Sequence, residues 1–294
     1  MMIALEVLQK LYLTACEVEL QAFKPGNVSV YADGHDMTVA DFRASAEVSA
    51  GPLCRPDYSL GEKIYYSIKA TREAVGCNTN LGIVLLCAPL IQAASMLASG
   101  ETLRQALTRV LIQTTVADAD WAYRAITLAA PGGLGSSCAE DVREKASVTL
   151  LESMKIAAER DRIAFQYSTN YQDIFDFSIG LYYNVMRKRI GRNWAAVSVY
   201  AGLLSRFPDS HIERKYGDRF SGMVAAKMAS LSDALDRADD PEQLLPLLYR
   251  MDQDFKCRGI NPGTTADLTV ATVLTALLED ALGHGRSASQ YDCR

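Results

Sequence analysis

One segment of the chain is apolar almost throughout: Leu81-Gly82-Ile83-Val84-Leu85-Leu86-Cys87-Ala88-Pro89-Leu90-Ile91-Gln92-Ala93-Ala94-Ser95-Met96-Leu97-Ala98. Its length approaches the ~20 residues with which a helix crosses a bilayer. It is nevertheless interrupted by Gly82, Pro89 and Gln92, and neither an aromatic belt nor a basic flank marks its ends. We therefore interpret it as the buried central helix of a protein that has no membrane partner.

Helical spacing continues on both sides of this segment. Apolar residues recur every three or four positions between Ala4 and Val18, which lines one face of a helix. Helix-start signals follow where Thr102 precedes Gln105 by three residues and where Asp240 precedes Pro241. Further helices are expected at residues 61–75, 117–129, 146–158, 171–190, 193–206, 219–237, 241–257 and 265–282.

Strand signals, in contrast, are weak. No run alternates polar and apolar residues between hairpin turns, and no β-branched blocks alternate with the helices. No repeat of fixed period is visible, which disfavours a solenoid. The sequence predicts an all-α fold, with a single multi-helix globular domain at residues 1–283 and a loose polar tail at residues 284–294.

Composition narrows the class of protein. The chain has 294 residues, of which 49% are hydrophobic, and 30 Lys and Arg against 35 Asp and Glu give a net charge of −5. A mildly acidic chain of this kind is a poor candidate for binding nucleic acid. Its 7 cysteines are scattered without a C-x-x-C pair. This usage is typical of reduced thiols in a cytoplasmic protein and excludes a disulfide framework.

Four polar segments that contain glycine interrupt the helical pattern, and the first is residues 23–37. It contains Lys24, Asn27 and Ser29, followed by the adjacent pair His35-Asp36. A lysine can neutralise a phosphate, and a histidine or an aspartate can accept a proton from a hydroxyl at neutral pH. The structural alternative is a turn in which the short polar residues serve the backbone and His35 is exposed.

The second and third segments both lie at expected helix starts. Asn78, Thr79 and Asn80 precede the apolar helix, where free N–H groups and the helix dipole favour an anion. One of them could instead serve only as an N-cap. In residues 207–217, Asp209 or Ser210 can cap a short helix. That helix would carry three cationic residues suited to a polyphosphate: His211, Arg214 and Lys215. The structural alternative is a solvated turn.

The fourth segment is residues 260–268. Thr264 and Asp267 are spaced as a capping box, which would explain both residues structurally. The functional interpretation is a helix start that faces an anion or a metal, with Thr264 and Thr265 toward the substrate and Asp267 available to Mg²⁺. Residues 131–135 are rich in glycine but lack the lysine of a P-loop, and no G-x-G-x-x-G, H-E-x-x-H or G-x-S-x-G motif occurs.

In their order along the chain, these segments resemble the triphosphoribosyl-dephospho-CoA synthase family. The resemblance rests on Lys24-Pro25-Gly26-Asn27-Val28-Ser29, Gly34-His35-Asp36-Met37 and Asn78-Thr79-Asn80-Leu81-Gly82. It continues in the run Asp209-Ser210-His211-Ile212 with Arg214-Lys215 and Gly217, and in Pro262-Gly263 with Ala266-Asp267-Leu268. It covers residues 10 to 280 approximately, and four short motifs in the same order make a specific signal.

The resemblance implies an all-α transferase that uses ATP as a glycosyl donor. Members displace adenine from C1′ of the ribose with the 2′-hydroxyl of 3′-dephospho-CoA, and Mg²⁺ is expected on the triphosphate. The chemistry needs a base, for which we expect His35 or Asp36, and cations for the phosphates. We expect Lys24, His211, Arg214 and Lys215 to bind phosphates, Asp36 and Asp267 to face Mg²⁺, and Asn27, Ser29, Asn78, Thr79, Asn80, Thr264 and Thr265 to contact the substrates.

Two motifs depart from the lyase-associated members of the family. Those members tend to have Asn-Thr-His-Lys-Gly at residues 78–82 and Pro-Gly-Leu-Val at residues 25–28, and the present pattern is closer to an archaeal and methylotroph-like branch. A tetrahydromethanopterin-type cofactor precursor is therefore an alternative acceptor. A different ATP-using helical transferase and a non-catalytic helical nucleotide-binding protein are further alternatives. The sequence leaves the oligomeric state open, a homo-oligomer included.

Overall fold

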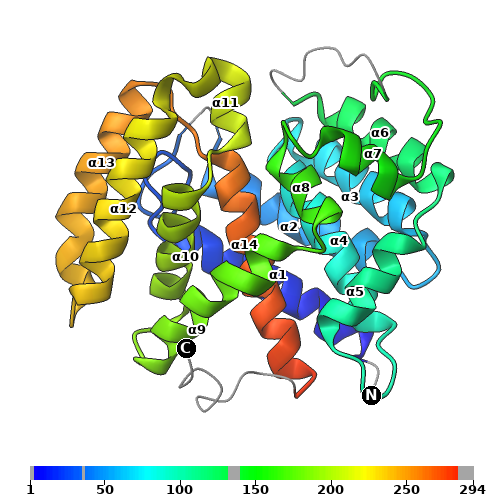
Figure 1. The fold of residues 1–294 in the computed structure, drawn as a ribbon, viewed down its shortest axis with the longest axis horizontal. Coiled ribbons are helices and arrows are strands. Elements are labelled where there is room, and N and C mark those ends of the chain that lie inside the picture. Colours follow the sequence, from blue (N-terminus) through cyan, green and yellow to red (C-terminus); the bar gives the residue numbers. More distant parts are fainter. Residues whose placement is uncertain (1–2, 35–36, 132–139, 284–294) are drawn as a thin grey trace. The chain divides into compact units, whose positions relative to one another are not determined.

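The computed structural model describes residues 3–34, 37–131 and 140–283, and the elements of secondary structure named in this range are all helices (Figure 1). Apart from isolated β-bridges between Ser29 and Ala32 and between Gly34 and Met37, the described residues form no β-structure. The predicted all-α fold is confirmed. No helix within this range is long and apolar enough to cross a membrane.

The chain divides into two compact units, each of which is discontinuous in sequence. Unit 1 consists of Met1–Thr14 and Ala40–Gln172, and unit 2 consists of Ala15–Val39 and Asp173–Arg294. Helix α1 (Leu5–Gln21) contributes its first half to unit 1 and its second half to unit 2.

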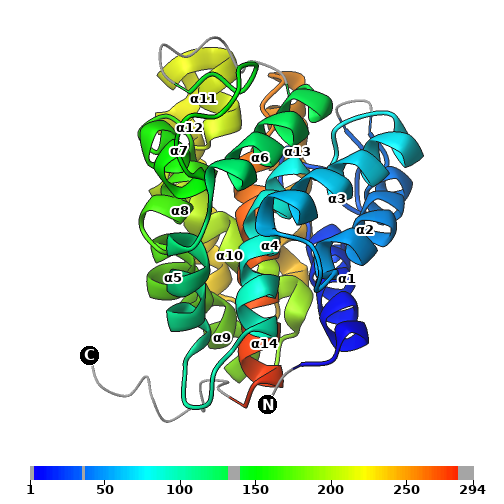
Figure 2. The same ribbon diagram turned by 90° about the vertical axis from the view of Figure 1, so that its right-hand side faces the viewer.

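Unit 1 is built around the apolar helix α4 (Leu81–Ser95), in which every residue except Gln92 and Ser95 is buried. Helix α4 packs against α3, α5, α6 and α8, and Figure 2 shows it between α3 and α5. The helices of this unit are α2 (Val39–Cys54), α3 (Leu60–Val75), α4, α5 (Leu103–Ile112), α6 (Val116–Ala129), α7 (Leu150–Ala157) and α8 (Arg162–Ser168). The expected buried central helix is therefore the core of this unit.

A proline lies in the middle of α4, and tyrosines from outside the helix compensate for it. Pro89 has no N–H, so it cannot donate the usual helix hydrogen bond to Leu85 O, four residues back. The Tyr167 hydroxyl donates to Leu85 O at 2.6 Å instead, and the Tyr171 hydroxyl donates to Leu86 O at 3.0 Å. Both tyrosines are fully buried. The proline is thus accommodated inside the core.

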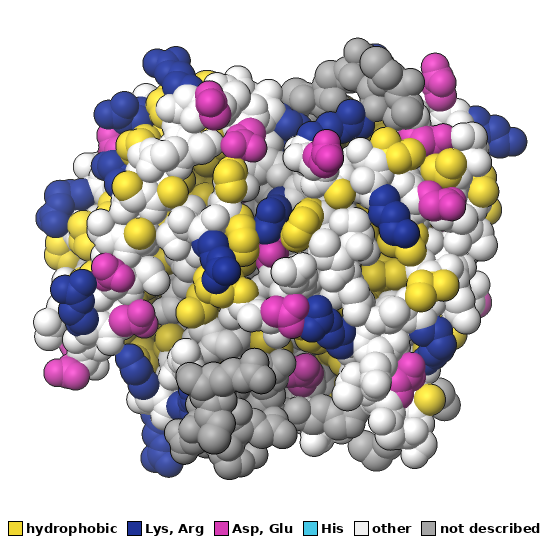
Figure 3. Space-filling model, in the orientation of Figure 1, with side chains coloured by type: hydrophobic (Ala, Val, Ile, Leu, Met, Phe, Trp, Pro, Cys, Tyr) yellow, Lys and Arg dark blue, Asp and Glu magenta, His cyan; other side chains and the backbone are white. Residues whose placement is uncertain are grey.

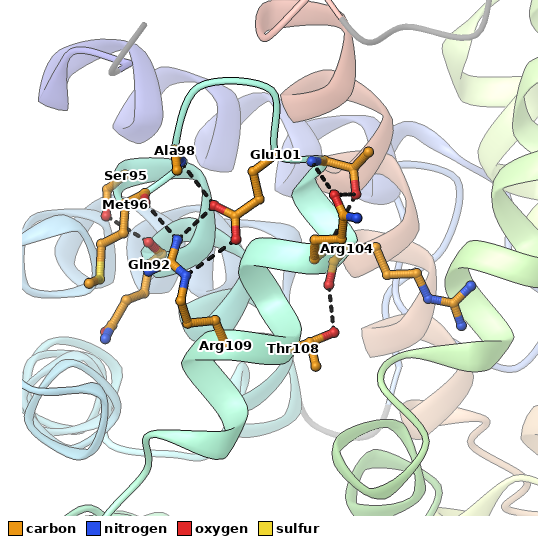
Figure 4. A network of polar contacts seen from close by, with 10 residues as sticks. Gln92, Ser95, Met96, Ala98, Glu101, Arg104, Thr108 and Arg109 are labelled. Atoms are coloured by element: carbon orange, nitrogen blue, oxygen red, sulfur yellow. Dashed lines mark hydrogen bonds and ion pairs between the residues drawn. The ribbon is translucent and has the colours of Figure 1, made fainter.

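A polar network ends α4 at Ser95, three residues before the predicted end at Ala98 (Figure 4). Arg109 of α5 donates to both oxygens of Glu101 and to Met96 O, and the Ala98 N–H also donates to Glu101. These bonds hold the chain in a turn between the two helices. The predicted helix start at Thr102 is confirmed, because Thr102 and Gln105 form a capping box.

Unit 2 is built around the long helix α14 (Gly263–Ala281), which packs against α9, α10, α11 and the π-helix η1. The elements of this unit are η1 (Ile174–Ser178), α9 (Ile179–Arg187), α10 (Arg192–Arg206), α11 (Ser210–Tyr216), η2 (Gly217–Phe220), α12 (Ser221–Arg237), η3 (Pro241–Leu244) and α13 (Leu245–Cys257). Figure 1 shows α12 beside α13, and an ion pair of 2.9 Å joins Lys227 to Asp254 between them.

Helix α14 carries buried threonines whose hydroxyl groups are satisfied within the helix. Thr269, Thr272 and Thr275 are each fully buried, and each donates to the backbone carbonyl four residues earlier. Burying a hydroxyl without such a bond would be costly. The threonines therefore allow a partly polar helix to occupy the centre of the unit.

On the face drawn in Figure 3, described basic and acidic side chains are interspersed rather than gathered by sign.

Candidate functional site

The buried carboxylate of Asp209 connects α11 to the first turn of α14. One oxygen accepts hydrogen bonds from the N–H groups of His211 and Ile212 at 2.9 and 3.1 Å, so Asp209 caps α11 as predicted. The other oxygen accepts from the N–H and the hydroxyl of Thr265, both at 2.7 Å. Burial raises the pKa of Asp209, while the bonds from Thr265 and the charge of Arg214 act in the opposite direction. We call this arrangement the α11–α14 joint.

The predicted capping box of Thr264 and Asp267 is wrong. Helix α14 begins at Gly263, and the N-cap position is occupied by Pro262, whose side chain provides no cap. The cap of this helix comes instead from Asp209, which is distant in sequence and therefore invisible to a local pattern. Thr264 and Thr265 both lie buried in the first turn.

The imidazole of His211 lies directly against the start of α14. A Cβ atom added to Gly263 would stand 2.9 Å from His211 Nδ1, so only glycine leaves room for the ring in this position. Asp267 follows Gly263 by four residues and therefore lies one turn further on the same helix face. The structure thus brings His211 close to Gly263.

Arg214 and Lys215 occupy the last turn of α11. The charge of Arg214 acts to lower the pKa of Asp209, against the larger effect of burial. Lys215 is exposed, with its amine 5.0 Å from the centre of the Tyr216 ring. The three cationic residues predicted from residues 207–217 therefore share one short helix, whose N-terminal end is tied to α14.

Lys24 of the first motif is fully buried and forms an ion pair of 3.0 Å with Glu19. Its amine also donates to Val28 O at 2.7 Å and to Ala22 O at 3.4 Å. Burial lowers the pKa of Lys24 and raises the pKa of Glu19, although the two charges stabilise each other. In this structure, Lys24 therefore stabilises the loop that follows α1 from the inside.

The same loop docks onto the residues that precede α14. Gly26 has a φ of +84°, its N–H donates to Asp252 at 2.8 Å, and a Cβ there would stand 2.9 Å from Ile260 O. The Asn27 amide donates to Asn261 at 2.9 Å. Because Asn261 lies two residues before Gly263, the first and fourth motifs meet in unit 2. Ser29 is fully buried in the same loop.

The expected catalytic pair His35 and Asp36 lies outside the described residues. The chain just before this pair is held by Lys256 of α13, which forms an ion pair of 2.9 Å with Asp252 and donates to Ala32 O at 3.4 Å. Within the described range, no group of three His, Cys, Asp or Glu residues is arranged to hold a metal ion by itself.

The second motif lies in unit 1, at the start of α4. The N-cap residue is Asn80, whose side chain makes no capping bond, and Asn78 accepts from the Leu81 N–H at 3.2 Å. The hydroxyl of Thr79 bonds to that of Ser45. The Asn80 amide donates to Ser45 O at 3.4 Å and to the Ser49 hydroxyl at 3.3 Å. Its Oδ1 atom is buried and accepts no hydrogen bond from any described residue. A buried acceptor of this kind is costly unless a ligand or water satisfies it.

The sequence did not reveal three residues that contact the motif segments, namely Glu19, Asp252 and Asn261. It also did not reveal the hydrogen bonds from Thr265 to Asp209. Local patterns could not have found them, because Asp252 is separated from Gly26 by 226 positions and Asn261 from Asn27 by 234.

Comparison with known proteins identifies the family of the chain. The family profile of the ATP:dephospho-CoA triphosphoribosyl transferases matches residues 5–286. The fold resembles the crystal structure of a candidate triphosphoribosyl-dephospho-CoA synthase from Archaeoglobus fulgidus, with a TM-score of 0.60 and 22% identity over 80% of this chain and 98% of that chain. No curated protein matches the chain significantly. Because the profile spans both units, the chain belongs to the ATP:dephospho-CoA triphosphoribosyl transferase family.

Proposed function

We propose that the α11–α14 joint binds the triphosphate of ATP in the reaction of this family. The chain is a transferase of the triphosphoribosyl-dephospho-CoA synthase type, since the family profile covers residues 5–286. In this reaction, a hydroxyl of 3′-dephospho-CoA forms a bond to C1′ of the ATP ribose. The bond between C1′ and N9 breaks, adenine leaves with that electron pair, and a base takes the hydroxyl proton.

Electrostatics support the assignment of the triphosphate to the joint. The N-terminus of α14 carries a partial positive charge, and Arg214 and Lys215 each add a full one. Asp209 contributes a negative charge, so the joint has a net positive charge only because both Arg214 and Lys215 are present. Thr264 and His211 would add donors for phosphate oxygens, whereas both donors of Thr265 bond to Asp209 and hold the joint together. The single observation that carries the proposal is the Asp209 carboxylate, which joins the first turn of α11 to the first turn of α14.

We assign the proton transfer to His35 or Asp36 on the chemistry of their side chains. The substrate hydroxyl must lose a proton as its oxygen approaches C1′, and an imidazole or a carboxylate can accept that proton at neutral pH. We assign Asn27, whose amide bonds to Asn261 just before α14, to position a substrate oxygen, with Lys24 and Ser29 supporting its loop. Asn78, Thr79 and Asn80 are assigned to substrate binding in unit 1, where Asn80 Oδ1 offers an acceptor to a hydroxyl.

The donor set fits Mg²⁺ bound together with a nucleotide. Mg²⁺ in such sites takes only one or two protein carboxylates and is otherwise held by phosphates and water. Asp267 can supply one carboxylate beside the joint, and Asp36 is the second candidate. The ion would neutralise phosphate charge.

Chromatography of free adenine tests the proposal. The purified protein is incubated with ATP and Mg²⁺, with and without 3′-dephospho-CoA. We expect adenine only when the acceptor is present. Arg214→Gln and Lys215→Gln should each lower the rate and raise the KM for ATP, whereas Arg219→Gln on the neighbouring exposed turn should not. If adenine were released only with a pterin-type precursor, that precursor and not 3′-dephospho-CoA would be the acceptor. Release of phosphate or pyrophosphate without adenine would disprove glycosyl transfer.

A further inference from the structure

Unit 2 contains a cavity of about 270 Å³ to which the proposed function assigns no role. It lies where the loop after α1 meets the start of α10. Aromatic side chains from both elements line it together with polar side chains: Phe23, Tyr31, Trp194, Gln21, Arg192 and Glu242. Ligand pockets are concave, with aromatic walls and a few convergent polar groups, and this cavity has both features.

The orientation of Tyr31 is fixed by an aromatic cluster beneath it. Its ring stacks on the buried Phe23 ring with centroids 4.9 Å apart and an interplanar angle of 5°. Tyr249 packs edge-on against Phe23 at 4.7 Å, on a side that does not line the cavity. Tyr31 itself is 37% exposed. A rigid, partly exposed ring is a suitable platform for stacking a planar ligand, because little conformational entropy is lost on binding.

Polar groups around the cavity provide specificity. The Trp194 indole N–H donates to Glu242 at 3.2 Å, which fixes the indole and draws the carboxylate to the wall. Burial raises the pKa of Tyr31 and the charge of Glu242 adds to the rise, so this carboxylate also lies near the tyrosine. Arg192 contributes an exposed cation at the first residue of α10. A ligand with a planar ring, an amino group and a phosphate would match all three features.

We propose that this cavity binds the adenine ring of a nucleotide, with its face on Tyr31, its amino group toward Glu242 and its phosphate toward Arg192. The volume suits one nucleoside-sized group rather than an entire CoA derivative. The proposal rests on the proposed function in one respect, because that function supplies two sources of the same adenine, ATP and 3′-dephospho-CoA. The loop that carries Tyr31 also carries the first motif.

Tryptophan fluorescence reports directly on this cavity. The chain has 2 tryptophans, Trp121 in unit 1 and Trp194 in the cavity wall, so Trp121→Phe leaves Trp194 as the only reporter. In that variant, adenosine should quench the fluorescence saturably, and inosine, which lacks the amino group, should bind about tenfold more weakly. Separate titrations with ATP and with 3′-dephospho-CoA, neither in the presence of the other, identify the source of the ring.

Substitutions in the same background test the stacking. Tyr31→Ala should weaken adenosine binding about tenfold, since stacking of a base on an aromatic ring contributes on this scale. Glu242→Gln should remove the preference for adenosine over inosine. Tyr58→Ala is the matched control, because it removes a partly exposed ring from an aromatic pair of unit 1 that does not line the cavity, and it should leave binding unchanged. Circular dichroism of each variant checks that the helices are intact.

Turnover separates this inference from the proposed function. Tyr31→Ala should raise the KM of the substrate that quenches Trp194 about tenfold and leave kcat almost unchanged. Adenine release without any saturable change of Trp194 fluorescence, and with unaltered KM values in Tyr31→Ala, would overturn the inference and leave the function standing. Adenosine binding without adenine release under any condition would support the cavity and overturn the function.

Discussion

At the scale of single residues, the buried pair of Glu19 and Lys24 shows how the stability of the fold depends on a buried charge. Both side chains are almost fully shielded from solvent, and each is balanced by the other. Removing one partner of a buried ion pair leaves an uncompensated charge, which typically costs about 3–5 kcal/mol of unfolding free energy. Replacing both partners by apolar groups of similar volume is far less costly.

We predict that Lys24→Met destabilises the protein in a pH-dependent manner. Burial already raises the pKa of Glu19 above its ordinary value of 4.5, and the loss of Lys24 raises it further. Folded Glu19 then keeps a proton that the unfolded chain releases, so the unfolding free energy falls as pH rises above 4.5. The stability deficit measured by urea unfolding should therefore be larger at pH 8 than at pH 5.

Two variants make this test specific. Glu19→Leu combined with Lys24→Met should recover more than half of the lost stability and remove the pH dependence of the deficit. Lys69→Met breaks the exposed pair with Glu73 and should show neither effect. A Lys24→Met deficit that is constant with pH would mean that Glu19 is not buried as described.

Residue chemistry also sets a limit on what the sequence could reveal. Two of the motif segments do meet, since residues 24–29 contact the chain that precedes α14 through Asn27 and Asn261. The burial of Lys24 could not be predicted, because a lysine beside Pro25-Gly26 has the appearance of an exposed loop residue. Its partner Glu19 lies in the preceding helix, and no local spacing rule links the two.

At the scale of elements, helix positions followed from the sequence and helix ends did not. Periodicity identified α3, α6 and α10 to within a residue or two, because each has a clear apolar face. The end of α4 depends on Arg109, and the start of α14 depends on Asp209, so both are set by side chains from other elements. The π-helix at Ile174–Ser178 interrupts the helix expected at residues 171–190.

We predict that Tyr167→Phe and Pro89→Ala compensate for each other. Tyr167→Phe leaves Leu85 O buried without its donor and should lower the unfolding free energy by about 1–3 kcal/mol. In the double variant, the alanine that replaces Pro89 has an N–H that can donate to the same carbonyl, so most of the loss should be recovered. Urea unfolding of the four proteins gives the coupling energy, and strictly additive effects would contradict the assignment.

The joint between α11 and α14 gives a second prediction at this scale. Gly263→Ala places a methyl group where His211 Nδ1 lies 2.9 Å away, and the flexible imidazole must move. Adenine release should fall about tenfold, which corresponds to ~1.4 kcal/mol of transition-state stabilisation. The unfolding free energy should change by less than about 1 kcal/mol, since alanine favours the helix.

Gly222→Ala is the matched control for this variant. Gly222 lies near the start of α12, and a Cβ there would meet no atom within 4 Å. The substitution should leave adenine release unchanged and should not reduce stability. If Gly263→Ala retained full activity, the position of His211 would be irrelevant to the reaction.

At the scale of the whole molecule, the division into two units was invisible in the sequence. The chain offers no linker, low-complexity tract or change in composition at residues 14, 39 or 172, where it passes from one unit to the other. The units are defined by contacts between distant segments, such as the one from Gly26 to Asp252. Two apolar helices, α4 and α14, are each the core of one unit, and only the first stood out as an exceptional apolar run.

This organisation predicts that residues 1–39 are required by both units. In unit 1, the Tyr12 hydroxyl bonds to that of Ser49 at 2.9 Å. In unit 2, the Tyr200 hydroxyl donates to Pro25 O at 2.8 Å, and Asp252 accepts from Gly26.

A chain that begins at residue 40 should therefore lose cooperative thermal unfolding in calorimetry. A peptide of residues 1–39 added in trans should restore a transition whose Tm rises with peptide concentration, because ligand binding stabilises the folded state by mass action. Tyr12→Phe, which removes only one hydrogen bond, should keep a single cooperative transition with a slightly lower Tm. An unchanged transition in the shortened chain would show that each unit folds without α1.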